Sequence, residues 1–132
     1  LAPNSRSYQK IKNVLNSNAK GVYQGKIYVK DIAQKTDAYQ LSKALLLNDD
    51  TEFNSKPELE IYADDVKCSH GSTSGNVEED SLYYLMTRGL SRKESLMLLI
   101  NGFLNDIVDV IKSNTIKDFI SSNLEKQIYE YK

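Results

Sequence analysis

The sequence predicts a protein of mixed β and α structure, with strands in residues 1–75 and helices in residues 76–132. In the first part, apolar residues recur at every second position, which is the period of a strand with one buried face. In the second part, they recur at every third or fourth position, as in an amphipathic helix. Turn residues separate the predicted strands, and capping residues precede the predicted helices. These observations predict one β domain and one helical subdomain.

Three segments of the first part have the composition of strands, because they are rich in Tyr, Val and Ile. They are GVYQGKIYVKD (21–31), AYQLSKALLLN (38–48) and PELEIYADDVKC (57–68). In the first segment Ile27 and Val29 stand two positions apart, and the other two contain similar pairs. Asn48, Asp49 and Asp50 supply turn chemistry after the second segment.

The spacing of these strands leaves two arrangements open. Ile27 precedes Leu45 by 18 residues, and Leu45 precedes Ile61 by 16. Intervals of this size are compatible with the stacked turns of a β-solenoid. They are also compatible with a meander of antiparallel hairpins. Periodicity alone slightly favours the hairpins, because two unequal intervals are thin evidence for a repeat.

The first predicted helix covers the segment VEEDSLYYLMTR (77–88). Asn76, followed three positions later by Glu79, is an N-cap arrangement with acids in the first turn. Gly89 is placed to end the helix in a left-handed conformation. We expect Tyr83 and Tyr84 to form a partly buried edge of this helix.

Two further helices follow. Ser91 and Glu94 fit the S-x-x-E capping box, which predicts a longer second helix. Its apolar positions step by threes and fours: Leu96, Leu99, Ile100, Phe103, Leu104, Ile107, Val108 and Ile111. A last helix is predicted from Thr115, with an apolar stripe of Ile116, Phe119, Ile120, Leu124 and Ile128. Three short amphipathic helices can form a small bundle or a docking surface.

Cys68 and His70 are the only cysteine and the only histidine of the chain. They stand two positions apart, where the third predicted strand leads into a small polar loop, GSTSG (71–75), so they share a strand face. Thiolate and imidazole are both metal ligands. A lone cysteine is more often a small buried apolar residue, and a lone histidine is often a hydrogen-bonded structural one. With no second pair in the chain, a metal or cluster bound here needs ligands from another chain.

Two catalytic interpretations are weaker. A small thiol-dependent enzyme would use Cys68 with His70, but side chains at i and i+2 of a strand do not usually reach hydrogen-bond geometry. Asp64 and Asp65 would be a carboxylate pair, but two acids beside a turn are more often solvated or cap the backbone. The sequence also contains no Gly-rich phosphate loop and no G-x-S-x-G motif. It therefore assigns no catalytic residue.

Composition excludes several classes of partner. A net charge of −1 argues against a nucleic-acid partner, which requires a basic excess. The apolar run from Leu96 to Ile100 is far shorter than the ~20 residues of a membrane span.

A single cysteine allows no internal disulfide and suits a reducing compartment. The chain opens at Leu1 without a secretory signal, and we expect it to be part of a longer protein.

Several motifs occur together in one order along the chain. They are AQKTDAYQ (33–40), LLL (45–47), P-x-L-E-I-x-A-D-D-V-K-C-x-H-G (57–71), YYL with RG (83–89) and NGF (101–103). With these motifs the chain resembles the SufB/SufD family of iron–sulfur cluster assembly proteins, over about residues 21–112. The segment from Lys67 to Gly71 is more similar to the SufD form, because SufB-like chains carry a Glu-His-Glu-type segment there.

The resemblance implies a fold that replaces the hairpins. Residues 1–75 would be the last rungs of a right-handed parallel β-helix, with rungs of 16 to 18 residues, and residues 76–132 a C-terminal helical subdomain. An uncapped β-helix end exposes unpaired strand edges. We therefore expect the first residues to be disordered or paired with a neighbour, and the isolated chain to self-associate through these edges.

The resemblance also implies a function. The chain would be a scaffold subunit, and no enzyme, that pairs with a SufB-like subunit and docks a SufC-like ATPase. His70 matches the family position that helps to hold the nascent iron–sulfur cluster at the contact with SufB, and Cys68 matches a cysteine of the same motif. Neither would hold a cluster without the partner chain. The compartment would be the bacterial cytoplasm or a plastid-type organelle.

Overall fold

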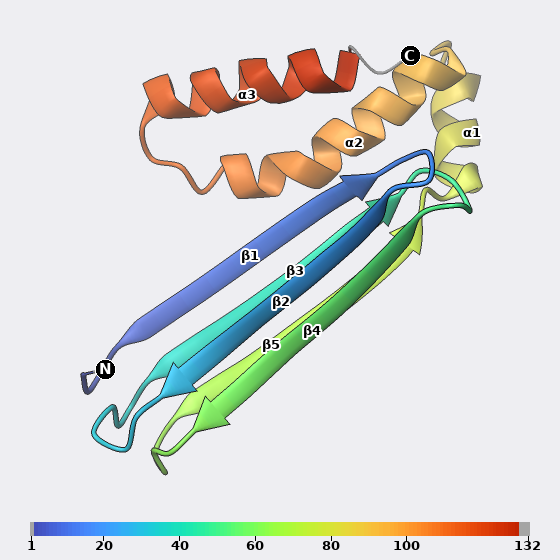
Figure 1. Ribbon diagram of the computed structural model, residues 1–132. Helices are drawn as coiled ribbons and strands as arrows, with labels where there is room; N and C mark the ends of the chain where they lie inside the picture. The colour runs from blue at the N-terminus through green and yellow to red at the C-terminus, as the bar shows by residue number, and fades with distance from the viewer. Residues whose placement is uncertain (1, 130–132) are drawn as a thin grey trace. The chain divides into compact units, whose positions relative to one another are not determined.

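The structure, a computed structural model, describes residues 2–129 and contains five strands followed by three helices (Figure 1). The strands are β1 (Arg6–Leu15), β2 (Lys20–Val29), β3 (Asp37–Leu46), β4 (Glu52–Ile61) and β5 (Lys67–Asn76). The helices are α1 (Glu79–Thr87), α2 (Arg92–Val108) and α3 (Asn114–Tyr129). The chain divides into two compact units, Leu1–Gly75 and Asn76–Lys132.

The strands of the first unit form two parallel sheets, so the predicted antiparallel hairpins are wrong. One sheet has the order β1-β3-β5, and the other contains β2 and β4. Figure 1 shows β1, β3 and β5 running in one direction and β2 and β4 in the other. The chain therefore alternates between the sheets, and each strand of one sheet lies in the connection between two parallel neighbours of the other.

The repeat of this unit is twice as long as the spacing between successive strands. Arg6 pairs with Asp37, 31 positions later, and Lys20 pairs with Glu52, 32 positions later. The intervals of 16 to 18 residues seen in the sequence separate strands of different sheets. The expected rung of 16 to 18 residues is therefore wrong, because strands that pair within one sheet stand 31 or 32 positions apart.

The turns between the sheets also stack on one another. Asn4 and Lys35 both adopt a left-handed backbone, with φ of 58° and 59°. The Asn4 amide donates to the Gln34 carbonyl at 2.9 Å, and the Lys35 amide donates to the Asp65 carbonyl at 2.6 Å. Residues 2–15 thus form a turn and β1, which pairs with β3 of the same chain. The expected disorder is therefore wrong for these residues, and pairing with a neighbouring chain stays a prediction.

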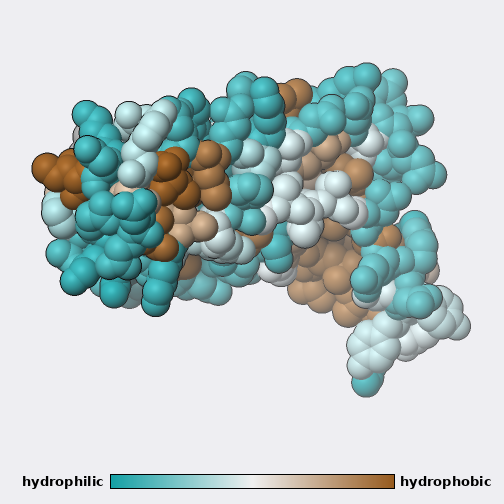
Figure 2. Space-filling view, turned by 90° about the horizontal axis from the view of Figure 1, so that it is seen from below, coloured by the Kyte–Doolittle hydropathy of each residue, from teal (hydrophilic) through white to brown (hydrophobic). Residues whose placement is uncertain are grey.

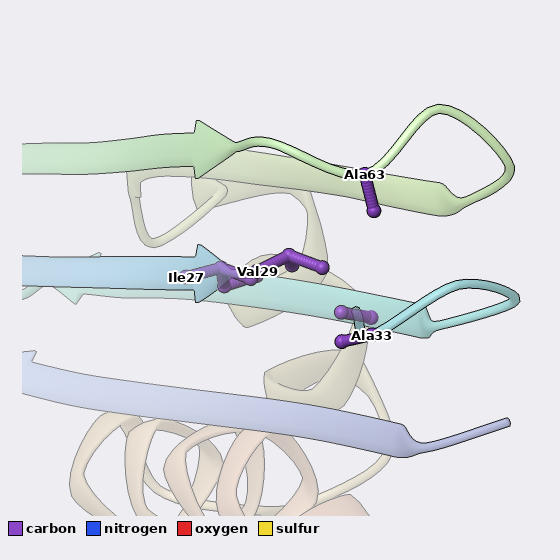
Figure 3. Packing of buried hydrophobic residues seen from close by; sticks show 5 residues of the cluster. Ile27, Val29, Ala33 and Ala63 are labelled. Atoms are coloured by element: carbon purple, nitrogen blue, oxygen red, sulfur yellow. The ribbon is translucent and has the colours of Figure 1, made fainter. Parts of the chain in front are cut away.

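The core of the first unit lies at one end of the strands. Buried residues alternate with exposed ones along β2, and its last two inward side chains, Ile27 and Val29, are buried. Figure 3 shows them near the end of β2, with Ala33 in the turn that follows and Ala63 in the segment after β4. Ala38 completes the cluster. Because three of the five cluster residues are alanines, the two sheets can lie close together at this end.

The first helix begins later than predicted. The predicted N-cap, Asn76, is still part of β5, so the helix begins after it. The observed N-cap is Glu78, whose side chain makes no capping hydrogen bond. Gly89 has a φ of +96°, as predicted for the residue that ends this helix. Tyr83 and Tyr84 are 70% and 57% exposed, so the partly buried edge expected for them is wrong.

The second and third helices agree closely with the sequence. Ser91 accepts from the Glu94 amide at 3.2 Å while the Glu94 carboxylate accepts from the Ser91 amide at 2.8 Å, which is the predicted capping box. Helix α3 begins at Asn114, one residue before the predicted start. Helix α2 contacts both α1 and α3. No helix among residues 2–129 has the length and apolarity needed to cross a membrane.

Candidate functional site

Cys68 and His70 both lie within β5. The polar loop predicted at residues 71–75 is wrong, because this segment continues the strand to Asn76. Glycine is a weak strand former, and residues 71–75 contain no aromatic residue and no Val or Ile, but pairing with a neighbouring strand can override such a preference. Here the neighbour is β3, next to β5 in the three-stranded sheet.

The hydrogen bond at the start of β5 shows which residues of β3 lie beside the site. The Asp37 amide donates to the Ser5 carbonyl at 2.9 Å, and Asp37 pairs with Arg6, the residue after Ser5. The Lys67 amide donates to the Thr36 carbonyl at the same distance. In both cases the amide donates to the residue before its pairing partner, so the partner of Lys67 is Asp37, the residue after Thr36.

That register places the two site residues on the strand. Cys68 then lies beside Ala38, and His70 lies beside Gln40. Gly71 agrees with this register, because a Cβ atom on it would lie 3.3 Å from Cδ1 of Leu41. The inward face of β5 therefore carries Cys68 and His70, since successive side chains alternate.

The two residues differ in burial although they share a face. Cys68 is half-buried and packs against the core cluster that contains Ala38 and Ala63, whereas His70 is exposed. The packing of Cys68 is that of a small apolar residue. The imidazole is accessible to a second chain, and an exposed, neutral imidazole is a suitable metal ligand. The geometry thus suits His70 for ligation better than Cys68.

Residues 2–129 contain no group of three or more His, Cys, Asp and Glu side chains that could hold a metal ion. A metal or cluster at β5 would therefore need ligands from outside this part of the chain. Asp64 and Asp65 are exposed in the turn after β4. The exposure of both residues agrees with the expectation that these acids are solvated, and the Asp65 amide takes part in the turn by donating to the Gln34 side chain at 2.9 Å.

Sequence reasoning missed one residue beside the site. Gln40 is 1% exposed and donates through Nε2 to Oε1 of Gln9 at 2.9 Å. Its own Oε1 has no hydrogen-bond partner within the part of the chain that the structure describes. The 31-residue interval from Gln9 to Gln40 is the repeat of the first sheet, and a further 30 residues lead to His70. Recognition of this repeat would have placed Gln40 beside His70.

A cavity of about 350 Å³ lies at a different place, among the turns. Its lining includes Arg6, Lys35 and Lys67 together with Asp37 and Asp65. The cations and carboxylates there are interspersed, and neither Cys68 nor His70 belongs to the lining. The cavity is therefore separate from the candidate site.

Comparison with known proteins gives a consistent family. The family model for the SUF system FeS cluster assembly SufBD core domain matches residues 1–103. An iron–sulfur cluster assembly SufBD family protein of Synechocystis is 41% identical over 109 residues. The iron–sulfur cluster assembly protein SufD of Escherichia coli is 32% identical over 122 residues, and the chloroplastic protein ABCI7 of Arabidopsis thaliana is 38% identical over 105 residues.

These relatives are much longer than the present chain. The alignments cover 83%, 92% and 80% of this chain, but only 24%, 29% and 22% of the three relatives in the same order. The chain thus spans about a quarter of the length of the relatives that it matches. The matched part includes all five strands and the first helix.

Proposed function

The chain belongs to the SufB/SufD family and is SufD-like within it, and from this premise we propose that it is part of a scaffold subunit for iron–sulfur cluster assembly in the Suf system. The support is the family match over residues 1–103 and the likeness to relatives that are named for cluster assembly. The bacterial and chloroplastic relatives fit a location in the bacterial cytoplasm or in a plastid-type organelle.

The first unit is, on this proposal, a segment of a right-handed parallel β-helix. Two parallel sheets, a pairing interval of 31 or 32 residues and stacked turns support this assignment. Connections between parallel strands of one sheet are right-handed in about 98% of cases, which favours that hand. A β-helix offers a rigid frame, which suits a scaffold.

We assign to β5 the contact with a SufB-like subunit. Among the described residues β5 is an edge strand of its sheet, since β3 lies on one side of it only. The unpaired amides and carbonyls of an edge strand can accept a strand from another chain. The same edge explains why the isolated chain would self-associate when the partner is missing.

The observation that carries the proposed site is the exposed His70 on this edge strand. The nascent iron–sulfur cluster is the cargo of such a scaffold, and imidazole is an established iron ligand in protein clusters. His70 would supply one ligand, Cys68 could add a second after a shift from its packed position, and the partner would supply the rest. This chain alone would therefore hold no cluster.

The helical unit would dock a SufC-like ATPase. Several large apolar side chains of its helices are exposed, among them Tyr83, Leu98 and Phe119. On the one face of the molecule drawn in Figure 2, hydrophobic residues gather in patches within a mostly hydrophilic surface. Exposed apolar patches of this kind mark protein contacts. Hydrolysis of ATP would belong to the partner, and this chain would have no catalytic residue.

A thiol-dependent enzyme that uses Cys68 and His70 is the alternative. A catalytic cysteine should react rapidly with alkylating reagents in the isolated chain, because its thiolate is accessible. Cys68 is packed against the core instead. We therefore expect slow alkylation by iodoacetamide that accelerates when urea unfolds the chain. Fast alkylation of the folded chain would favour the enzyme.

The experiment that tests the scaffold function is co-purification. The protein is expressed with SufB-like and SufC-like subunits, and the purified material is analysed for subunits, iron and sulfide. We expect one complex that holds iron and sulfide, whereas the chain purified alone holds neither. Iron and sulfide in stoichiometric amount on the chain alone, or a failure of the three proteins to associate, would contradict the proposal.

A further inference from the structure

We propose that Gln40 is a positioning residue for His70: its buried Oε1 accepts a hydrogen bond from an imidazole N–H and so fixes the ring. The proposal rests on the proposed function of His70 as a ligand of the cluster cargo. A buried residue of the first unit, Gln40, would thus orient a ligand, His70, on the edge strand β5.

The first observation is the unpartnered amide oxygen of Gln40. The side chain is among the largest that are fully buried in the chain, at 1% exposed, and Oε1 has no partner among the described residues. A buried acceptor without a donor is costly, and few native groups remain so. A donor that can reach it is therefore expected, and it must come from a neighbouring element.

The direction of the amide indicates where that donor lies. Gln40 lies on β3, between β1 and β5. Its Nε2 is already used toward β1, where it donates to Gln9. The acceptor is thus left for the β5 side, and the residue of β5 beside Gln40 is His70. Gln9, Gln40 and His70 form a polar row, one residue for each strand of the sheet.

The opposite sheet leaves room for this row. Gly25 lies on β2, and a Cβ atom built on it would collide with the Tyr23 hydroxyl and would lie 2.5 Å from Nε2 of Gln40. A larger residue at this position would therefore displace the Tyr23 ring, the Gln40 amide or both. The absence of a side chain at Gly25 therefore permits the buried amide, and the crowding around it restricts the amide to few orientations.

The hydrogen bond would have a defined chemical effect. A neutral imidazole carries one N–H and one lone pair, and the partner of the N–H decides which nitrogen keeps the proton. A hydrogen bond to Gln40 would hold the proton on the inner nitrogen. The other nitrogen would then present its lone pair outward, toward iron. Partners of this kind orient ligating histidines in metal sites.

The single histidine of the chain makes the bond directly measurable. Nitrogen NMR of the chain labelled at histidine, at a pH where the imidazole is neutral, gives the ratio of the two tautomers without any cluster. We expect one tautomer to be enriched about fivefold over its ratio in the urea-unfolded chain, the factor that one net hydrogen bond produces. The same ratio in folded and unfolded wild-type chain would overturn the proposal.

Two variants and one control separate this effect from general damage. Gln40→Leu removes the acceptor, and Gly25→Ala crowds the Gln40 amide and the Tyr23 hydroxyl without deleting either. Each is expected to return the tautomer ratio to that of the unfolded chain, and Gly25→Ala serves if Gln40→Leu fails to fold. Ser42→Ala is the control, because Ser42 is also buried with an unpartnered hydroxyl but lies two positions away on β3. It should leave the ratio unchanged.

Cluster content separates a failure of this proposal from a failure of the proposed function. In the complex, Gln40→Leu should lower iron and sulfide several-fold while His70→Ala abolishes them. The same tautomer ratio in wild type and in Gln40→Leu would overturn the positioning role of Gln40 without affecting the ligand role of His70. Full cluster content in the His70→Ala complex would overturn the ligand role, whatever the tautomer ratio.

Discussion

Cys68 and His70 stand two positions apart on one face of β5, yet Cys68 packs against the core while His70 is exposed. Cys68 lies beside Ala38 and packs against the core cluster, whereas His70 lies beside Gln40, outside that cluster. Two residues that look equivalent in the motif therefore differ in their contributions. Cys68 contributes to the fold, and His70 is free to act at the surface.

This difference predicts opposite sensitivities in folding. Cys68→Ser places a hydroxyl against the core and should lower the free energy of unfolding by about 1–3 kcal/mol. His70→Ala should cost about 1 kcal/mol, because the side chain is exposed and the loss is mainly that of one net hydrogen bond to Gln40. Urea denaturation of both variants measures the two changes. A larger loss for His70→Ala than for Cys68→Ser would show that the register of β5 is wrong.

The two glycines of the helical unit should also respond in opposite ways. Gly89 has a φ of +96°, so Gly89→Ala should destabilise the protein by about 1–2 kcal/mol. Gly102 lies within α2, and a Cβ atom added to it would enter open space, so Gly102→Ala should stabilise the protein by up to about 1 kcal/mol. Thermal unfolding followed by circular dichroism compares them. Equal effects of one sign would contradict the left-handed helix end.

The capping box of α2 predicts a dependence on pH. Hydrogen bonds from the side chain and the amide of Ser91 hold the pKa of the Glu94 carboxyl below its ordinary value. A lowered pKa stabilises the fold above the pKa of the unfolded chain, and this contribution is lost as pH falls through the folded value. Stability should therefore fall in acid more steeply than in Glu94→Gln. Identical pH profiles would show that the box does not form in solution.

The Ser91 cap should make a measurable contribution to the free energy of unfolding. Ser91→Ala should cost about 1 kcal/mol of stability at neutral pH, because the Glu94 amide loses its partner. Ser122→Ala is a matched control, since its hydroxyl only donates within α3 to the Phe119 carbonyl at 3.0 Å. Urea denaturation should show a clear loss for the first variant and little change for the second.

The exposed apolar residues of α3 predict the docking of an ATPase subunit. Phe119 is 69% exposed, so Phe119→Asp should leave the helical unit folded. It should weaken binding of the SufC-like subunit tenfold or more if this surface is the contact, because buried aromatic anchors dominate such interfaces. Asp118→Ala, at the neighbouring exposed position, is the control. Unchanged affinity of a folded Phe119→Asp variant would place the docking surface elsewhere.

The helices were readily predicted because their signals are local. The capping box at Ser91 and the left-handed Gly89 each depend on residues within one turn of the chain. Burial was harder to predict. Tyr83 and Tyr84 are large and partly apolar, yet both are exposed, since neither composition nor period tells which face of a short helix finds a partner.

The strands were predicted less well because their stability comes from stacking. β5 is rich in serine and glycine, and it forms because β3 offers it a ladder of hydrogen bonds. β1 gives no strong strand signal and was missed for the same reason. A better signal was present in the turns. Asn16 and Asn48 begin equivalent turns 32 positions apart, and Asn48 donates to the Ser17 carbonyl at 2.9 Å.

The site was predicted in its residues but not in its surroundings. Cys68 and His70 were singled out as the one pair of metal-capable side chains in a family motif, and their ligand role stays a prediction. The contrast in their burial depends on the register of β5, and so does the position of Gln40. A register between strands 30 residues apart cannot be found from the motif alone.

The central claim is that His70 holds the cluster cargo in the assembled complex. The most direct measurement is the iron and sulfide content of the purified complex that carries His70→Ala, beside its subunit composition and melting temperature. Ser69→Ala is the matched control, because Ser69 is also exposed but points to the opposite face of β5. We expect an intact His70→Ala complex with the same subunit composition, a melting temperature lowered by no more than a few degrees, and depleted iron and sulfide, beside an unchanged Ser69→Ala complex. Full iron and sulfide in an intact His70→Ala complex would contradict the claim.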